Sequence, residues 1–149
     1  MKELIKEIVA QASALKNKHT NQKEALVNYA CIFCQDEQEY EEFLGLAKEL
    51  GEVVKEYPNG LLFKVKLKTV AGELRLLKIR KLDPTRPERG DADFTVENYA
   101  KFKAEVLGKE KFKLIPKEEF EMIELIDPEF RVRAYFSHPT LGETLKIKN

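Results

Sequence analysis

Two cysteines, Cys31 and Cys34, have the spacing of a CxxC pair, which serves redox chemistry or zinc binding in suitable folds. They lie in an apolar, aromatic-rich segment, residues 25–34, that we predict to be a buried strand. Side chains three residues apart in a strand point to opposite faces, so these thiols cannot share a metal or a disulfide. The chain has no other cysteine to complete a zinc site. We predict two buried structural thiols.

The second feature that could support binding or catalysis is a group of cations. Four positive side chains fall close together: Arg80, Lys81, Arg86 and Arg89. Because a guanidinium can bind a carboxylate or a phosphate through two parallel hydrogen bonds, these residues could line an anion site. The alternative, which we favour, is that neighbouring acids pair with them at the surface: Asp83, Glu88 and Asp91.

The motifs of common enzyme classes are missing. No Ser/His/Asp order, phosphate-binding glycine loop or nucleotide fingerprint occurs in the chain. The two histidines, His19 and His138, lie outside the predicted strands, and His138 is interpreted as an exposed turn residue. The sequence therefore predicts an architecture more clearly than a reaction.

Composition excludes several classes of function. The 149 residues include 26 basic and 26 acidic side chains, and this balance argues against a protein that binds nucleic acid by neutralising phosphates. No apolar run reaches the roughly 18 residues of a membrane helix, and no signal peptide is recognisable. We expect a soluble, cytoplasmic protein, and its high charge content suggests heat adaptation.

Periodicity predicts an α+β chain. Apolar residues at spacings of three and four predict a helix over residues 2–18. Asp36, with Glu39 three residues on, predicts the start of a second helix, which ends at Gly51. Pro58-Asn59-Gly60 predicts a tight turn. The strands expected in the first half cover residues 25–34, 52–57, 61–70 and 73–81.

The order of elements then repeats after a linker, residues 83–90, that is rich in proline and charge. The second half is expected to contain a helix over residues 96–107 and strands over residues 91–96, 111–116, 120–126 and 130–137. The final tail needs no regular structure. Tyr40 and Phe43 in the first helix of the repeat match Tyr99 and Phe102, 59 residues later. The alternative is a generic α+β layout without a true repeat.

This pattern resembles the vicinal oxygen chelate superfamily, the glyoxalase and bleomycin-resistance fold. The resemblance rests on the order of elements, on Leu50-Gly51-Glu52, on the Pro-Asn-Gly hairpin, and on Gly90-Asp-Ala-Asp-Phe-Thr95. It implies two βαβββ modules whose sheets curl around a shared cleft in one domain. The expected parts are an N-terminal helix (residues 1–20), a first module (25–82), a second module (90–137) and a tail (138–149).

The family holds a divalent metal with side chains from the first and last strands of each module. The equivalent positions implied here are Tyr29, Lys78, Asp91 and Arg133. Lysine and arginine donate hydrogen bonds and carry positive charge, so they cannot replace histidine or carboxylate ligands. The chain therefore resembles a metal-ligand-poor member, such as small archaeal ones, with no cofactor. The four residues would instead form a cation-rich pocket for a small anion, unless Asp91 and Arg133 form a structural ion pair.

Three functions remain open. The first is a small-ligand-binding protein or enzyme that uses the cleft without a metal. The second is a non-catalytic interaction protein, expected to be a homodimer, that associates through its sheet edges or its N-terminal helix. The third is a metal-dependent enzyme in which the acids on the strands hold a hard cation: Asp91 and Asp93 with Glu121 or Glu124.

Overall fold

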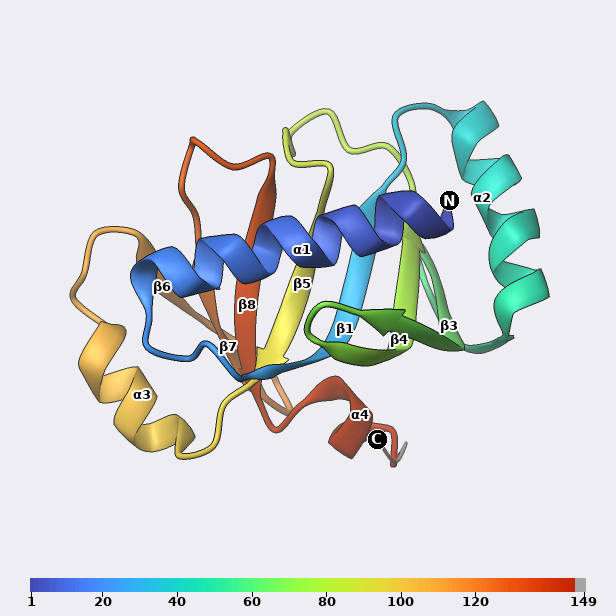
Figure 1. The fold of residues 1–149 in the computed structure, drawn as a ribbon. Coiled ribbons are helices and arrows are strands. Elements are labelled where there is room, and N and C mark those ends of the chain that lie inside the picture. Colours follow the sequence, from blue (N-terminus) through green and yellow to red (C-terminus); the bar gives the residue numbers. More distant parts are fainter. Residues whose placement is uncertain (147–149) are drawn as a thin grey trace.

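A computed structural model describes residues 1–146, which form one eight-stranded mixed sheet and four helices (Figure 1). The helices are α1 (Lys2–His19), α2 (Glu37–Leu50), α3 (Tyr99–Val106) and α4 (Leu141–Thr144). The strands are β1 (Leu26–Phe33), β2 (Glu52–Tyr57), β3 (Gly60–Thr69), β4 (Gly72–Arg80), β5 (Gly90–Thr95), β6 (Phe112–Pro116), β7 (Glu121–Leu125) and β8 (Val132–His138). The predicted α+β class is confirmed, and each predicted strand is found within two residues of its expected bounds.

The strands lie in the order β2-β3-β4-β1-β5-β8-β7-β6. β1 runs parallel to β4, and β5 runs parallel to β8. The other adjacent pairs are antiparallel, including β1 with β5 at the centre of the sheet. The first and last strands of each half of the chain are therefore neighbours in the sheet.

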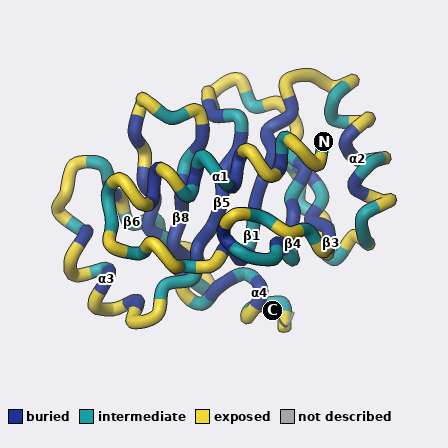
Figure 2. The backbone as a smooth tube through the Cα atoms, in the orientation of Figure 1, coloured by how far each residue is buried: buried dark blue, intermediate teal, exposed yellow. Residues whose placement is uncertain are grey.

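Helix α1 lies across the central strands and covers one face of the sheet (Figure 1). Its buried residues are Ile5, Ile8, Val9, Ala12, Leu15 and Lys16. They pack in one core with alternate residues of the strands, such as Ala30, Ala92 and Ala134. Gly90 is required at its position because a Cβ atom there would lie 2.4 Å from the Cys31 carbonyl oxygen and 2.7 Å from Ile8. Figure 2 shows that the central strands are the most buried part of the backbone.

The tight turns form where glycine was expected to permit them. Gly60, after Pro58-Asn59, has a φ of 158° and begins β3, and Gly72 has a φ of 98° and begins β4. Side chains with a Cβ atom rarely adopt the conformation of Gly72, which supports the prediction of a turn at this position. These two turns set the register of the antiparallel strands β2, β3 and β4.

The N-terminus of α2 has the predicted cap. The Asp36 side chain accepts a hydrogen bond of 2.7 Å from the Glu39 backbone N–H. In return, the Glu39 carboxylate accepts one of 3.0 Å from the Gln35 backbone N–H. One free backbone donor of the first turn is therefore satisfied, and the residue before the N-cap is held to the helix as well.

We expect Asp36→Ala to lower the free energy of unfolding by about 1 kcal/mol, since the cap bond is lost. The change corresponds to a fall in Tm of roughly 2–4 °C for a chain of this length. Thermal unfolding followed by circular dichroism measures it, with Glu42→Ala, an exposed position on the same helix, as the control. An equal Tm for the two variants would show that the cap adds no stability.

The structure corrects three details of the second half. Helix α3 starts at Tyr99, three residues later than predicted, because the Asn98 side chain caps it by accepting from the Lys101 N–H. The tail contains the short helix α4, capped by Thr140, where no regular structure was expected. His138 is the last residue of β8 and stacks on Tyr99 at 4.8 Å, so it is not a turn residue. Among residues 1–146, no helix is long and apolar enough to cross a membrane.

Candidate functional site

The face of the sheet opposite α1 carries the polar residues of the four central strands. Alternation explains this, because the intervening residues of each strand are in the core beneath α1. In register across β4, β1, β5 and β8 lie Lys78, Cys31, Asp91 and Arg133. Tyr29 lies on the same face, one row further along, opposite Asp93. The four residues predicted from the sequence therefore share one face, which we call the strand-face site.

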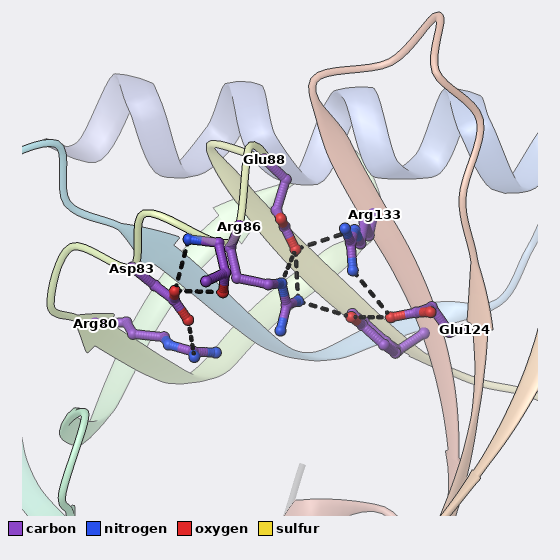
Figure 3. A network of polar contacts seen from close by, with 8 residues as sticks. Arg80, Asp83, Arg86, Glu88, Glu124 and Arg133 are labelled. Atoms are coloured by element: carbon purple, nitrogen blue, oxygen red, sulfur yellow. Dashed lines mark hydrogen bonds and ion pairs between the residues drawn. The ribbon is translucent and has the colours of Figure 1, made fainter.

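The linker after β4 contributes a closed ring of polar contacts at this face (Figure 3). The Glu88 carboxylate accepts from Arg86 Nε at 2.9 Å and from Arg133 Nε at 3.0 Å. Arg86 also donates to the Tyr135 hydroxyl at 3.2 Å, and that hydroxyl donates to Glu124 at 2.7 Å. Arg133 closes the ring by contacting Glu124 at 3.2 Å. These contacts hold the linker against β7 and β8, and we call them the Glu88 ring.

Phe33 lies beside the linker on the β1 side of the site. The Arg80 guanidinium is centred 4.4 Å from the Phe33 ring, and that of Arg86 is 5.1 Å from it. Both distances are within the range of cation–π attraction. Arg80 is also paired with Asp83 at 3.1 Å, as Figure 3 shows. The aromatic ring thus supports two guanidinium groups that belong to different segments of the chain.

Asp91 differs from its neighbours because it is buried and unpaired. It is 6% exposed, and its carboxylate has no hydrogen bond or ion pair with any residue in 1–146. Burial raises the pKa of Asp91 to about 7, helped by the nearby charges of Glu88 and Asp93 and opposed by Arg86 and Arg80. The carboxyl group therefore changes its charge near neutral pH.

Lys78 is the second unpaired charge. Its ammonium lies 4.3 Å from the centre of the Tyr57 ring and forms no salt bridge within the described chain. Burial lowers the pKa of Lys78, while the acidic groups of Cys31 and Asp91 raise it. Lys78 and Tyr29 both remain partly exposed, so solvent reaches the site from this side.

The cysteines are buried and free, as predicted. Cys31 lies between Lys78 and Asp91 in the row, and burial is the main reason that the pKa of its thiol is well above the usual range. Burial also raises the pKa of Cys34, to about 12. Neither thiol is a reactive nucleophile at neutral pH, because nucleophilic attack requires the thiolate.

The predicted pairings at this face need correction. Asp91 and Arg133 are neighbours in register, but they form no ion pair, since Arg133 is bound to Glu88 and Glu124. Glu88 does pair with a cation, yet it is buried and not at the surface. Arg89 pairs with Glu39 of α2, a contact that the sequence did not suggest. The expected pairing with neighbouring acids is confirmed for Arg80 with Asp83 and for Arg86 with Glu88, whereas Arg89 pairs with an acid from a distant element.

A divalent metal does not fit these residues. Two of the four positions that the resemblance implied as ligands hold cations, Lys78 and Arg133, which in their charged forms have no free lone pair to bind a metal. The other acids are occupied: Asp93 accepts from Asn28 and the Ser137 N–H, and Glu121 pairs with Tyr99 and Lys103. Within residues 1–146, no group of three His, Cys, Asp or Glu side chains is placed to hold a metal ion.

Sequence reasoning missed Tyr135 and Phe33 as members of the site. Tyr135 lies two residues after Arg133 in the same strand, so alternation could have placed both on one face. Phe33 has the same relation to Cys31. The contacts of Arg86 and Glu88 could not be predicted in this way, because a linker has no sequence periodicity from which the direction of its side chains follows.

Two hollows of the surface lie elsewhere in the structure. The larger, about 870 Å³, is lined by residues of the loop before β1, by the end of β5 and by α3. The smaller, about 350 Å³, adjoins it below the end of α1. Neither is lined by Tyr29, Lys78, Asp91 or Arg133. A cleft at the strand-face site stays a prediction.

Comparison with known proteins identifies similar structures. No protein-family model matches the chain, and the search of curated proteins finds no match. A structural-genomics protein, EC4020, is 12% identical, with a TM-score of 0.73 over 99% of this chain and 90% of that chain. At this identity the likeness shows a shared fold alone.

Two further structures have TM-scores below 0.5, which do not bear on function. A glyoxalase/bleomycin resistance protein/dioxygenase superfamily member from Vibrio splendidus 12B01 is 15% identical, with a TM-score of 0.46 over 76% of this chain and 97% of that chain. A mutant of 4-hydroxymandelate synthase from Streptomyces coelicolor is 12% identical, with a TM-score of 0.37 over 77% of this chain and 49% of that chain.

Proposed function

We propose that the protein binds a small organic anion at the strand-face site, through Lys78 and Asp91 with Tyr29 and Arg133 beside them. The observation that supports this is that Lys78 and Asp91 lack protein partners in a region where other charges are paired. Asp91 is buried, and burial also lowers the pKa of Lys78, so both charges are less well solvated than in water. A bound anion would compensate Lys78 directly.

The protonation of Asp91 suits the same ligand. Because burial raises its pKa to about 7, the protonated form of its carboxyl group is present near neutral pH. In that form it can donate a hydrogen bond to an oxygen of the ligand. The site therefore offers a cation and a neutral donor on opposite sides of Cys31.

We also propose that the chain is a two-module protein of the vicinal oxygen chelate type, folded as one domain. Support comes from the strand order, in which each half contains a strand, a helix and three strands, with its first and last strands parallel and adjacent. The site would then lie where the first and last strands of both modules meet. It would work without the family's metal, because cations occupy two of the ligand positions.

Thermal unfolding with small anions tests the binding proposal. We expect millimolar acetate, pyruvate, malonate or phosphate to include at least one anion that raises Tm by roughly 5–10 °C at pH 7. The shift should disappear in Lys78→Gln, because the cation that attracts the anion is gone. Lys66→Gln is the matched control, since Lys66 is an exposed lysine of β3. A shift that persists in Lys78→Gln, or no shift with any anion, would overturn the proposal.

Proton transfer is a second candidate function. A general acid or base works best when its pKa is near the operating pH, and Asp91 meets this condition. An anion identified by thermal unfolding would be incubated with the protein, and its products examined by NMR. Turnover that Asp91→Asn abolishes would establish an enzyme, and an unchanged anion would leave a binding protein.

Association as a homodimer remains our proposal for the quaternary structure. The sheet has two edge strands, β2 and β6, which offer unpaired backbone groups to a second copy. Light scattering after size-exclusion chromatography measures the mass directly. A monomer at every concentration would exclude this association.

A further inference from the structure

Four polar groups at the strand-face site have no partner within the described chain, and they are arranged by sign. On the β4 side are two donors, the Lys78 ammonium and the Arg80 Nε atom. On the side of β5 and the linker are two acceptors, the Asp91 carboxylate and the Glu88 Oε1 atom. Arg80 Nε and Glu88 Oε1 are fully buried, so a ligand cannot contact these two atoms directly, whereas it can reach Lys78 and Asp91. Lys78 and Asp91 are thus charged groups of opposite sign without a protein partner in residues 1–146, and a bound molecule with complementary groups would compensate both.

Strand β1 separates the donors from the acceptors. Lys78 pairs with Cys31 on one side of β1, and Asp91 pairs with Cys31 on the other. Two strand spacings place the backbones of Lys78 and Asp91 ~10 Å apart. Between them lie the buried side chains of Cys31 and Phe33, which form a floor without charge. A small molecule lying across β1 would contact both ends at once.

We infer that the ligand is dipolar, with a carboxylate bound by Lys78 and an ammonium or hydroxyl group bound by Asp91. This inference rests on the proposed binding of a small organic anion. A simple anion would compensate Lys78, but it would leave Asp91 unpartnered and bring a further negative charge towards its ionised carboxylate. A ligand with a donor at its other end satisfies both sides. Its class is that of small amino acids and hydroxy acids.

A matched series of four-carbon ligands tests the inference by calorimetry at pH 8, where Asp91 is mostly ionised. The probes are 4-aminobutyrate, 4-hydroxybutyrate, butyrate and butylamine. We expect 4-aminobutyrate or 4-hydroxybutyrate to bind at least tenfold more tightly than butyrate, because only these ligands contact both sides of β1. In Asp91→Asn this preference should fall to about twofold or less. Lys78→Gln should lower the affinity for every ligand that carries a carboxylate.

The outcomes separate the two proposals. If butyrate binds as tightly as the two-ended ligands, the dipolar inference is wrong and anion binding stands. If none of the carboxylates binds, and no anion alters thermal unfolding, both proposals fail. If the preference for the two-ended ligands is unchanged in Asp91→Asn, their donor group is bound elsewhere and the inference is again wrong. Two shorter amino acids, glycine and 3-aminopropionate, are tested as well. They show whether 4-aminobutyrate fails to bind only because its length does not match the site.

Discussion

Asp91→Asn is expected to stabilise the ligand-free protein at pH 8 by about 2–4 kcal/mol. The pKa of this carboxyl group rises from 3.8 to about 7 on folding, chiefly because of burial. A difference of this size corresponds to roughly 4 kcal/mol at 1.36 kcal/mol per pH unit, and relaxation around the charge reduces it. Asparagine has nearly the same shape and no charge, so it removes the cost of burying a carboxylate.

The sign follows from linkage. Because the pKa of Asp91 is raised in the folded state, protonation of this carboxyl group favours folding. Its contribution to the free energy of unfolding is fully present below pH 4. That contribution is lost as pH rises through about 7. Burial also raises the pKa of Asp93, to about 6, so its ionisation lowers the free energy of unfolding over a similar pH range. This loss is the same in the parent protein and in Asp91→Asn. The advantage of Asp91→Asn should therefore be small near pH 4 and reach its full size above pH 7.

Urea unfolding at several pH values between 4 and 8 measures this difference. Glu42→Gln is the control, because Glu42 is an exposed carboxylate of α2 and should show no such dependence on pH. A variant that is less stable than the parent protein at pH 8 would show that Asp91 has a stabilising partner. A difference independent of pH would mean that charge is not its cause.

Glu88→Gln should have the opposite effect and destabilise the protein by about 2–3 kcal/mol at pH 7. The Glu88 carboxylate is 4% exposed and lies between the guanidinium groups of Arg86 and Arg133. Glutamine keeps the volume but leaves two cations without their shared anion. Removing one partner of a buried ion pair costs about 3–5 kcal/mol, and the partial exposure of both arginines, 25% and 18%, lowers the expected value.

The matched control for Glu88 is Glu129→Gln. Glu129 also accepts from a cation, Lys18, but its side chain is 76% exposed, so we expect no measurable change in unfolding. Urea unfolding of both variants gives the comparison. Equal stabilities of the two variants would show that the Glu88 ring does not stabilise the fold. Opposite effects at Asp91 and Glu88, two acids three positions apart, would distinguish a free carboxylate from a paired one.

Much of the fold could be predicted because its signals are periodic. The apolar stripe of residues 2–18 identified α1, and Asp36 with Glu39 marked the start of α2. Alternation in β4 and β8 placed Lys78 and Arg133 apart from the core residues between them. The faces of the strands, and hence the members of the site, follow from this period of two.

The contacts of the site could not be predicted in the same way. The register between strands brings Asp91 beside Arg133, and an ion pair looked natural, but the linker carries Glu88 to Arg133 instead. Which acid reaches a given arginine depends on how the linker folds, and its sequence has no repeating pattern. The short helix α4 was missed for a related reason, because its four residues are too few to show a helical period.

The antiparallel pairing of β1 with β5 divides the proposed site between two stretches of chain. Lys78 and Arg80 belong to the stretch before the linker, and Asp91 and Arg133 belong to the stretch after it. The unpaired cation, Lys78, and the unpaired carboxylate, Asp91, therefore belong to different stretches. A ligand that touches both would join the two stretches across β1, on the face opposite the one where α1 already joins them. Ligand binding would then stabilise the same pairing of β1 with β5 that α1 covers on the other face. A ligand would therefore raise the free energy of unfolding of the whole sheet, and separation of the two stretches would abolish binding.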